Sequence, residues 1–189
     1  MGKRPASKPL ELGAIPLLRG ERVALDPARW LWALALEAAL EDLEYRRSGL
    51  HPPGEEIDDA LGRRDEEIGD GRAAILTLTV DGQIAGLFEL SILNPDSRSL
   101  RAGYWVAPGR RGNRYGVEGL RVLRDWVETS IDAERIELHI HPDNGPSLGL
   151  AAAAGFTERG PCQLSPAPPR GAQAVLFDWR RPMARDPAE

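Results

Sequence analysis

Three arginines and three glycines separate two regular elements in residues 106–120, which read V-A-P-G-R-R-G-N-R-Y-G-V-E-G-L. Residues 100–106 are typical of a strand, and the apolar positions after the loop recur at steps of three and four, which indicates an amphipathic helix. The first N–H groups of a helix lack partners within it and carry the positive end of its dipole, so this order favours an anion site. The residues concerned are Gly109, Gly112, Gly116, Arg110, Arg111 and Arg114.

The ligand expected at such a loop is a di- or polyphosphate, because glycines allow close backbone approach while arginines supply charge. One alternative is a solvated basic turn, since Gly/Arg loops are common. A P-loop nucleotidase is a weaker alternative, because no Gly-Lys-Ser/Thr follows the glycines.

Composition favours a soluble globular protein. The chain has 189 residues, a net charge of −5 and 42% hydrophobic residues, which suits one domain with a substantial core. An acidic balance argues against a general nucleic-acid binder. Cys162 is the single cysteine, so neither a disulfide framework nor a cysteine metal cluster is expected. No apolar run has the length of a membrane span and no signal peptide is recognisable, so we expect a cytoplasmic protein.

The N-terminal half is expected to combine two helices with a hairpin. Residues 22–25 are typical of a short strand, and Asp26 followed by Pro27 predicts the start of a helix that runs to about residue 48. Residues 55–70 carry eight acidic residues against two arginines, which predicts a short exposed helix. This acidic segment is either a solvated face or a rim that attracts cationic amines.

The clearest local signal is a β-hairpin. Residues 73–80 and 83–92 have strand patterns, and Asp81-Gly82 between them is a two-residue turn able to take positive φ. Residues 100–106 return as the third strand of a meander, which leads directly into the Arg/Gly loop.

The C-terminal half continues with alternating elements. The long helix is expected to end near Ser130, and the strand at 135–140 should lie parallel to the strand before the helix through a right-handed crossover. A small-residue helix at 148–154, closed by Gly155, and strands at 156–163 and 172–180 complete a mixed α/β domain over residues 10–181. Residues 1–9 and 182–189 are predicted to be disordered tails.

Residues 103–120 resemble the acetyl-CoA-binding region of the GNAT acetyltransferases. In the family motif Gln/Arg-x-x-Gly-x-Gly/Ala, Arg111 takes the first position and Gly116 the last, while Arg114 stands where the family usually has glycine. The surrounding text G-Y-W-V-x-P-x-x-R-G-x-x-Y-G-x-E-x-L is similar to the RimJ/RimL-like branch, which acetylates protein N-termini and related amines. The order of elements is also similar to the GNAT fold, in which a mixed, mostly antiparallel sheet with helices on both faces splays between the parallel strands.

The resemblance implies acetyl-CoA as co-substrate. A backbone N–H near Val106 would meet the thioester oxygen, with Trp105 beside it. The segment N-G-P-S-L-G-L-A-A-A-A-G-F is similar to the family's second helix, so Asn144 would contact the cofactor arm and Ser147 would lie near the sulfur. The cofactor-binding residues expected are Trp105, Val106, Arg111, Gly112, Asn113, Arg114, Tyr115, Gly116, Asn144 and Ser147.

Two residues that many relatives use for proton transfer are replaced here. Ala151 stands where they have a tyrosine acid, and Arg101 stands where they have a glutamate. Ser147 is our candidate acid, although a serine at a helix start also caps backbone amides. Candidate bases are Glu89 on the hairpin, which is otherwise an exposed strand carboxylate, and His141.

His141 alternates with His139, which would place both on one side of the sheet. A histidine has a pKa near neutrality, which suits a base or proton relay, although histidines at strand ends are often merely solvated. Two histidines without a third ligand make a poor zinc site, so no metal is expected.

The sequence therefore predicts an N-acetyltransferase that moves acetyl from acetyl-CoA to a primary amine in a ternary complex. The alternative is a non-catalytic acyl-CoA-binding or regulatory module on the same fold, which the residues at positions 101, 114 and 151 favour. The resemblance suggests a peptide N-terminus as acceptor, and the acidic segment would equally suit a small amine. Relatives often form homodimers, so a homodimer is a further expectation. No nucleic-acid or membrane partner is expected.

Overall fold

Eight strands form one sheet in the order β1-β2-β3-β4-β5-β6-β8-β7. The coordinates are a computed structural model that describes residues 10–42, 45, 55–163 and 173–182. The strands are β1 Leu18–Arg19, β2 Ala24–Asp26, β3 Ala73–Val80, β4 Gln83–Asn94, β5 Ser99–Val106, β6 Arg135–Ile140, β7 Thr157–Gln163 and β8 Gln173–Arg180. All neighbouring pairs are antiparallel except β5 and β6, which are parallel. The predicted mixed, mostly antiparallel sheet is confirmed.

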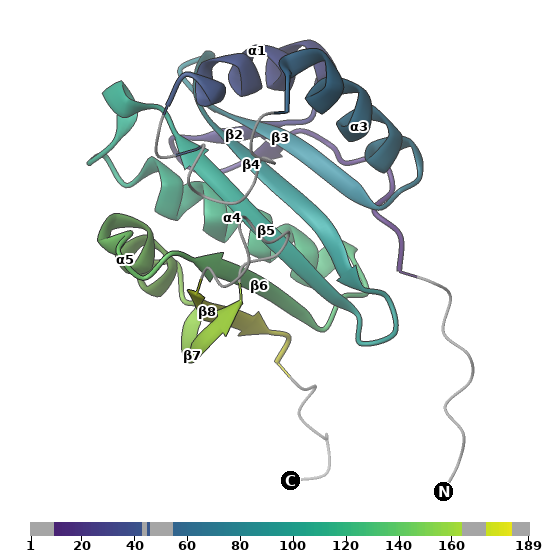
Figure 1. Cartoon of the computed structure of the whole chain (residues 1–189), viewed down its shortest axis with the longest axis vertical. Helices are drawn as coiled ribbons and strands as arrows, with labels where there is room; N and C mark the ends of the chain where they lie inside the picture. Colours follow the sequence, from purple (N-terminus) through teal and green to yellow (C-terminus); the bar gives the residue numbers. More distant parts are fainter. Residues whose placement is uncertain (1–9, 43–44, 46–54, 164–172, 183–189) are drawn as a thin grey trace, which may run out of the picture.

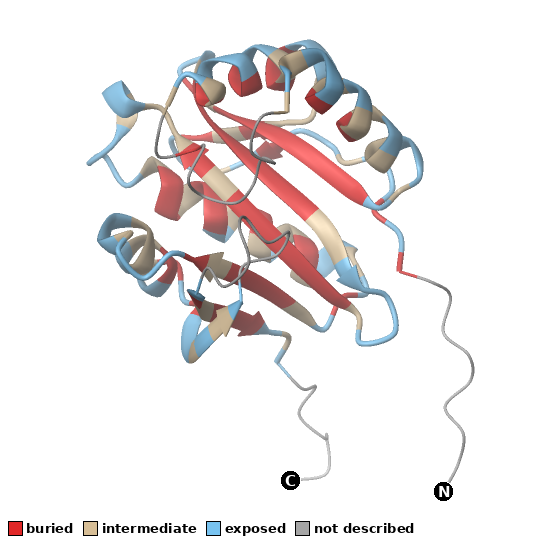
Figure 2. Cartoon of the chain, viewed as in Figure 1, coloured by how far each residue is buried: buried red, intermediate tan, exposed pale blue. Residues whose placement is uncertain are grey.

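Helices cover both faces of this sheet. The described helices are α1 Arg29–Leu40, α3 Ile57–Gly69, α4 Tyr115–Ser130, α5 Gly145–Ala153 and the short 3-10 helix η1 Pro108–Arg110. In Figure 1, α1 and α3 lie together on one face and α4 crosses the other. Figure 2 shows buried residues running along the central strands β3, β4 and β5. Each face therefore has a core of its own, and the central strands are enclosed between them.

The two cores are built from different helices. On one face, Leu120, Leu123 and Val127 of α4 are fully buried against the sheet, as the three-and-four spacing predicts. On the other face, Trp32 and Leu36 of α1 pack with residues such as Ile75 and Leu87. Because both faces of β3 are covered, nearly all of its residues are buried rather than every second one.

The predicted hairpin is confirmed and its turn has the expected geometry. Asp81 has a φ of 52° and Gly82 a φ of 74°, and two positive values match the twist of the flanking strands. β5 then returns antiparallel to β4 and leads into η1 and α4. The predicted strand at 135–140 and its parallel pairing with β5 are confirmed as well.

The N-terminal predictions need two corrections. Strand β2 begins at Ala24 and is preceded by β1, and α1 begins at Arg29 rather than at Pro27. The N-cap is Ala28 and not Asp26. The Oδ1 of Asp26 instead accepts the N–H of Ala28 at 2.8 Å, a local bond typical of an Asx turn before the helix. Helix α1 ends at Leu40, and the remainder of the predicted helix lies mostly outside the described residues, as do the tails at 1–9 and 183–189 and the loop at 164–172.

The acidic helix α3 is less exposed than its composition predicts. Two of its own residues, Ala60 and Arg64, are buried. Arg64 reaches the sheet and forms an ion pair with Glu89 of β4. A paired charge takes the place of the apolar stripe that the sequence prediction required, which is why periodicity alone did not reveal this contact.

Candidate functional site

The parallel pair β5 and β6 separates along its length. The two strands are paired only from Ser99 to Arg101 on β5 and from Arg135 to Glu137 on β6. Beyond these residues β5 continues to Val106 and β6 to Ile140 without pairing between them. The predicted splay is therefore present, and it opens toward the carboxyl ends of both strands, where ligands of such sheets bind.

A cavity of about 520 Å³ lies at this opening. Its walls are the end of β5, the Arg/Gly loop with the first turn of α4, and the first turn of α5. Tyr45, from the segment after α1, completes the lining. One cavity thus brings together the two stretches of sequence, separated by some thirty residues, that the family resemblance singles out.

The Arg/Gly loop has the backbone shape that a glycine-rich motif requires. Gly112 has a φ of 78°, and Arg114, directly before α4, has a φ of 63° and caps the helix without a side-chain hydrogen bond. A left-handed residue costs a non-glycine side chain about 1–2 kcal/mol. This explains why the family has glycine where this chain has Arg114. The arginine keeps the loop shape and adds a positive charge to the cavity wall.

Arg111 fastens the loop to the end of β5. Its Nε donates to the carbonyl oxygen of Val106 at 2.9 Å, and its guanidinium pairs with the carboxylate of Asp42. The same carboxylate accepts the indole N–H of Trp105 at 2.8 Å. Asp42 therefore joins the loop to the sheet, a role for which the sequence carries no signal.

Gly116 allows α4 to begin in close contact with its neighbours. A Cβ at this position would lie 2.6 Å from Cδ1 of Leu150 and 3.0 Å from Cγ2 of Val106. A larger residue therefore requires the side chain of Leu150, and to a lesser extent that of Val106, to move. The family's final glycine is thus explained by packing of the two helix N-termini around one cavity.

The backbone of Val106 faces the opening. The next N–H, that of Ala107, donates to Ala85 on the β4 side at 2.9 Å. Successive N–H groups of a strand point to opposite edges, so the N–H of Val106 points to the edge from which β6 has diverged. This is the direction that the expected contact with a thioester oxygen requires.

The start of α5 presents a pair of hydroxyl groups. Asn144 caps the helix, with its side-chain oxygen accepting the N–H of Ser147 at 3.1 Å. The hydroxyl groups of Ser147 and Tyr104 are 2.7 Å apart, and the Tyr104 hydroxyl also lies 3.1 Å from the Ser147 carbonyl oxygen. Burial raises the pKa of Tyr104 well above its usual range, against the opposing effect of the Ser147 hydrogen bond. The phenol therefore keeps its proton.

Sequence reasoning missed Tyr104 as a functional candidate because nothing in its local pattern distinguishes it from a core residue. Nine of the ten cofactor-binding residues predicted from the resemblance line the cavity. The exception is Asn113, whose side-chain amide donates to the carbonyl oxygens of Arg110 and Arg111 and so holds the loop together.

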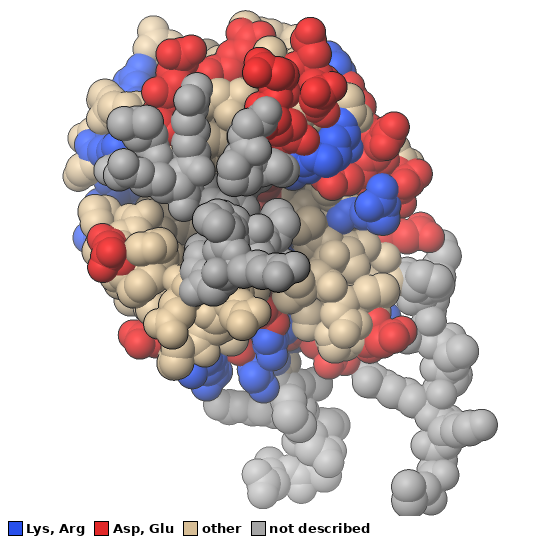
Figure 3. All heavy atoms as spheres, in the orientation of Figure 1, with Lys and Arg blue, Asp and Glu red and all other residues tan. Residues whose placement is uncertain are grey.

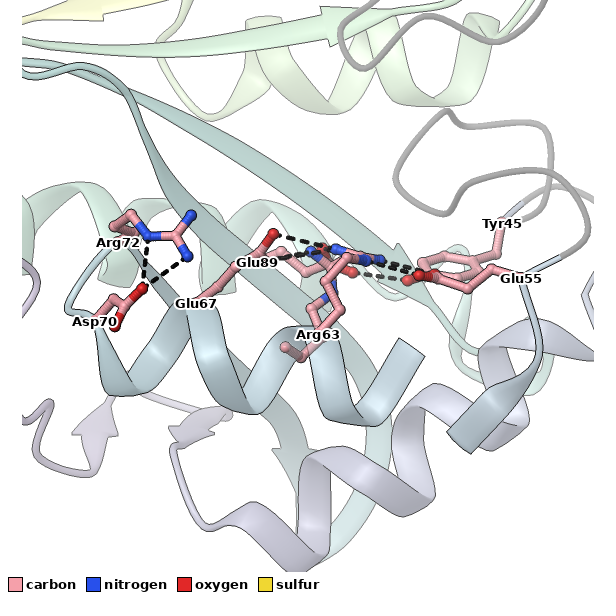
Figure 4. Close-up of polar contacts among 8 residues, drawn as sticks. Tyr45, Glu55, Arg63, Glu67, Asp70, Arg72 and Glu89 are labelled. Atoms are coloured by element: carbon pink, nitrogen blue, oxygen red, sulfur yellow. Dashed lines mark hydrogen bonds and ion pairs between the residues drawn. The ribbon is translucent and has the colours of Figure 1, made fainter. Parts of the chain in front are cut away.

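Glu89 lies in a different place and is buried rather than exposed. It lines a second cavity, of about 390 Å³, between α3 and the sheet. Its Oε1 accepts the hydroxyl of Tyr45 at 2.7 Å, and its Oε2 pairs with Arg64. In Figure 4, Tyr45 approaches Glu89 from one side and the α3 side chains from the other. Both oxygens are thus engaged, which weakens Glu89 as a base but makes it a fixed support for Tyr45.

The two histidines have different surroundings. His141 follows the last residue of β6, has a side chain 44% exposed, and lines neither cavity. Its predicted catalytic role stays a prediction. The ring of His139 is mostly buried and lies 2.9 Å from Glu137. Burial, then the charges of Arg101 and Arg135, lower the pKa of His139 to about 4, so it is neutral at pH 7.

The structure also bears on metal binding and on whether a helix spans a membrane. Among the residues that the structure describes, no three His, Cys, Asp or Glu side chains are placed to hold a metal ion. No helix in the same part of the chain is long and apolar enough to cross a membrane.

Comparison with known proteins also indicates a GNAT acetyltransferase domain. The family model for the acetyltransferase (GNAT) domain matches residues 22–157. A curated relative, the uncharacterized N-acetyltransferase p20 of Bacillus licheniformis, is 25% identical over 89 residues, which are 47% of this chain and 49% of the relative. The match thus spans about half the length of that relative.

Solved structures of similar fold cover nearly the whole chain. RimL, a ribosomal L7/L12 alpha-N-protein acetyltransferase in complex with coenzyme A, has a TM-score of 0.74 at 16% identity, covering 88% of this chain and 98% of its own. RimJ of Mycobacterium smegmatis in complex with CoA-disulfide has a TM-score of 0.70 at 24% identity, covering 87% and 86%. At these identities the likeness establishes the fold.

The left-handed conformation of Arg114 predicts how substitutions there affect stability. Arg114→Gly and Arg114→Ala both remove the guanidinium and differ only in backbone preference. Because alanine at positive φ is strained, we expect the alanine variant to be less stable than the glycine variant by about 1 kcal/mol. Urea denaturation of the pair measures this difference, and equal stabilities would contradict the loop geometry.

Proposed function

The chain belongs to the GNAT acetyltransferase family, and we propose that it transfers the acetyl group of acetyl-CoA to a primary amine by direct attack in a ternary complex. The observation that carries this proposal is the cavity between the diverging strands β5 and β6, which is lined by the two family motifs. The residues fit the cofactor, because the wall combines a helix N-terminus, a left-handed loop and the side chains of Arg110, Arg111 and Arg114.

When bound, acetyl-CoA supplies the activated acyl group as a thioester. The amides in the first turn of α4 and the loop arginines would bind the pyrophosphate. Because Gly116 has no side chain, the start of α4 lies close to Leu150 and Val106 in the cavity wall. The N–H of Val106 donates to the oxyanion that develops as the amine nitrogen bonds to the carbonyl carbon. Positioning of both substrates contributes much of the rate, because binding removes the entropic cost of their encounter.

The leaving thiolate requires a proton once the C–S bond breaks. We assign this donation to Ser147, with Tyr104 behind it, since the two hydroxyl groups are 2.7 Å apart in the cavity wall. The proton that the attacking nitrogen loses as the amide forms returns to this hydroxyl pair, so the overall transfer is balanced. The pair takes the place of the tyrosine that many relatives carry at the position of Ala151. The high pKa of Tyr104 keeps the donor protonated at all working pH values but also limits how strongly it donates.

The proposed acceptor is a protein or peptide N-terminus. Support comes from two solved structures of similar fold, those of RimL, a ribosomal L7/L12 alpha-N-protein acetyltransferase, and of RimJ. The amine would approach through the second cavity, beside Glu89. Tyr45 connects this cavity to the cofactor cavity, because it lines the cofactor cavity and its hydroxyl donates to Glu89 in the second. Two further parts of this proposal are a cytoplasmic location, which rests on the sequence patterns described above, and a homodimer, which rests on the resemblance.

Removal of Arg111 tests the cofactor site. Arg111→Ala loses a positive charge and the bond to Val106, so we expect coenzyme A to bind about 10- to 100-fold more weakly by calorimetry. Arg29→Ala is the matched control, because this exposed arginine of α1 pairs with Asp65 away from the cavity. Wild-type affinity in Arg111→Ala would show that the loop does not hold the pyrophosphate.

The hydroxyl pair is tested by kinetics of thiol release. Tyr104→Phe keeps the ring and Ser147→Ala keeps the helix, and we expect each to lower kcat about 100-fold, near the low end for general acid catalysis. Affinity for coenzyme A should change little. Unchanged kcat in both variants would assign the proton to another group. Coenzyme A binding by the wild type without turnover of any amine would favour the non-catalytic module instead.

A further inference from the structure

Arg101 is a buried cation that has no partner among the residues described by the structure. Only 8% of the residue is exposed, and its Nε is buried with no hydrogen-bond acceptor. Within the described residues, no hydrogen bond or ion pair joins its guanidinium to any other group. Burial of an unpaired charge is strongly unfavourable. An anionic ligand that entered the cavity would supply the partner that the Nε of Arg101 lacks.

The carboxylates around Arg101 are committed elsewhere. Glu89 binds Tyr45 and Arg64. Glu137, which lies opposite Arg101 in the β5–β6 register, binds Arg135 and His139. Burial lowers the pKa of Arg101, and the attraction of Glu89 does not compensate. The charge of Arg101 is therefore only partly neutralised by the protein itself.

Arg101 differs from the other charged side chains that line the cavity beside it, because each of those belongs to an ion pair. The lining of this cavity includes four arginines and two glutamates. Two of these arginines, Arg63 and Arg72, are paired with Glu55 and Asp70 at the rim. Arg101 and Gly103, on the same face of β5, form the floor of this cavity. An anionic group that enters the cavity would meet an unpaired guanidinium there.

The outer surface over α1 and α3 is acidic on the face shown in Figure 3, where Asp and Glu side chains gather. This surface attracts the ammonium of an acceptor, whereas the cavity beneath it accepts an anion. The combination fits a zwitterionic acceptor better than a polyamine, for which the unpaired Arg101 would be repulsive.

The position of Arg101 along β5 limits the size of this acceptor. Arg101 precedes Trp105, which lines the cofactor cavity, by four residues, or about 13 Å of strand. An acceptor that reaches both the thioester and Arg101 therefore has to span roughly 10 Å, the length of about three residues of extended peptide. In a free amino acid the amine and the carboxylate are too close together for this.

We infer that the acceptor is a peptide N-terminus with an acidic side chain at its second or third residue, and that Arg101 is the specificity-determining residue that binds this side chain. The inference rests on the proposed function and names its substrate class. It also gives a reason for arginine at the position where many relatives carry glutamate.

Calorimetry on the complex with coenzyme A tests the inference without requiring turnover. The probes are two tetrapeptides that begin with serine and carry either Asp or Asn at the second and third positions. We expect the Asp peptide to bind wild type at least 10-fold more tightly. In Arg101→Met this preference should disappear while affinity for coenzyme A stays the same, and Arg29→Met should behave as wild type. Equal binding of both peptides to wild type, or a preference that survives in Arg101→Met, overturns the inference.

Thermal unfolding supplies a second readout. If Arg101 were a structural residue, its replacement would lower Tm. Because an unpaired buried charge is removed, we expect Tm of Arg101→Met to stay level or to rise by roughly a few degrees. A large fall in Tm would assign Arg101 to the fold and contradict a ligand-binding role. Acetyl transfer to the peptides is measured separately, so binding of the Asp peptide without transfer refutes the proposed function and leaves the specificity of Arg101 in place.

Discussion

The structure depends on the early separation of β5 and β6. Three residue pairs hold these parallel strands together, and then each continues alone toward its carboxyl end. A strand edge without a partner exposes N–H and C=O groups, which are costly to leave unsatisfied. Here the Val106 carbonyl binds Arg111, and the N–H of Val106 remains directed at the opening. In the proposed mechanism, the interruption of the ladder provides both the space for the cofactor arm and the backbone donor for its thioester.

Every other part of the site is arranged to keep this opening in shape. Gly116 lets the two helix N-termini approach each other, and Arg114 accepts a left-handed backbone to start α4 at the correct place. On the opposite face of the sheet, Asp42 ties Arg111 to Trp105. Tyr45 connects the cofactor cavity to the buried pair of Glu89 and Arg64. The supports of the site are thus hydrogen bonds and ion pairs, of which the pair of Glu89 and Arg64 is buried.

Local patterns in the sequence predicted the elements well, because turn chemistry and apolar spacing act over a few residues. The Asp81-Gly82 hairpin, the long helix and the parallel strand after it follow from such patterns. Contacts between distant residues were not predictable in this way. Asp42, Tyr104 and Arg64 acquire their roles only when the fold brings them to Arg111, Ser147 and Glu89. The family resemblance indicated residues that the structure brings to one cavity. The arginine at position 101, by contrast, was recognised as a candidate only from its burial.

The central claim is that the opening between β5 and β6 holds coenzyme A through the amides at the start of α4. Amide hydrogen exchange with and without coenzyme A tests it most directly, since it reports individual backbone groups. The account predicts slower exchange on addition of coenzyme A at residues 112–117 and at Val106, with little change in the β3–β4 hairpin turn. Unchanged exchange at 112–117, or protection confined to another part of the chain, would contradict it.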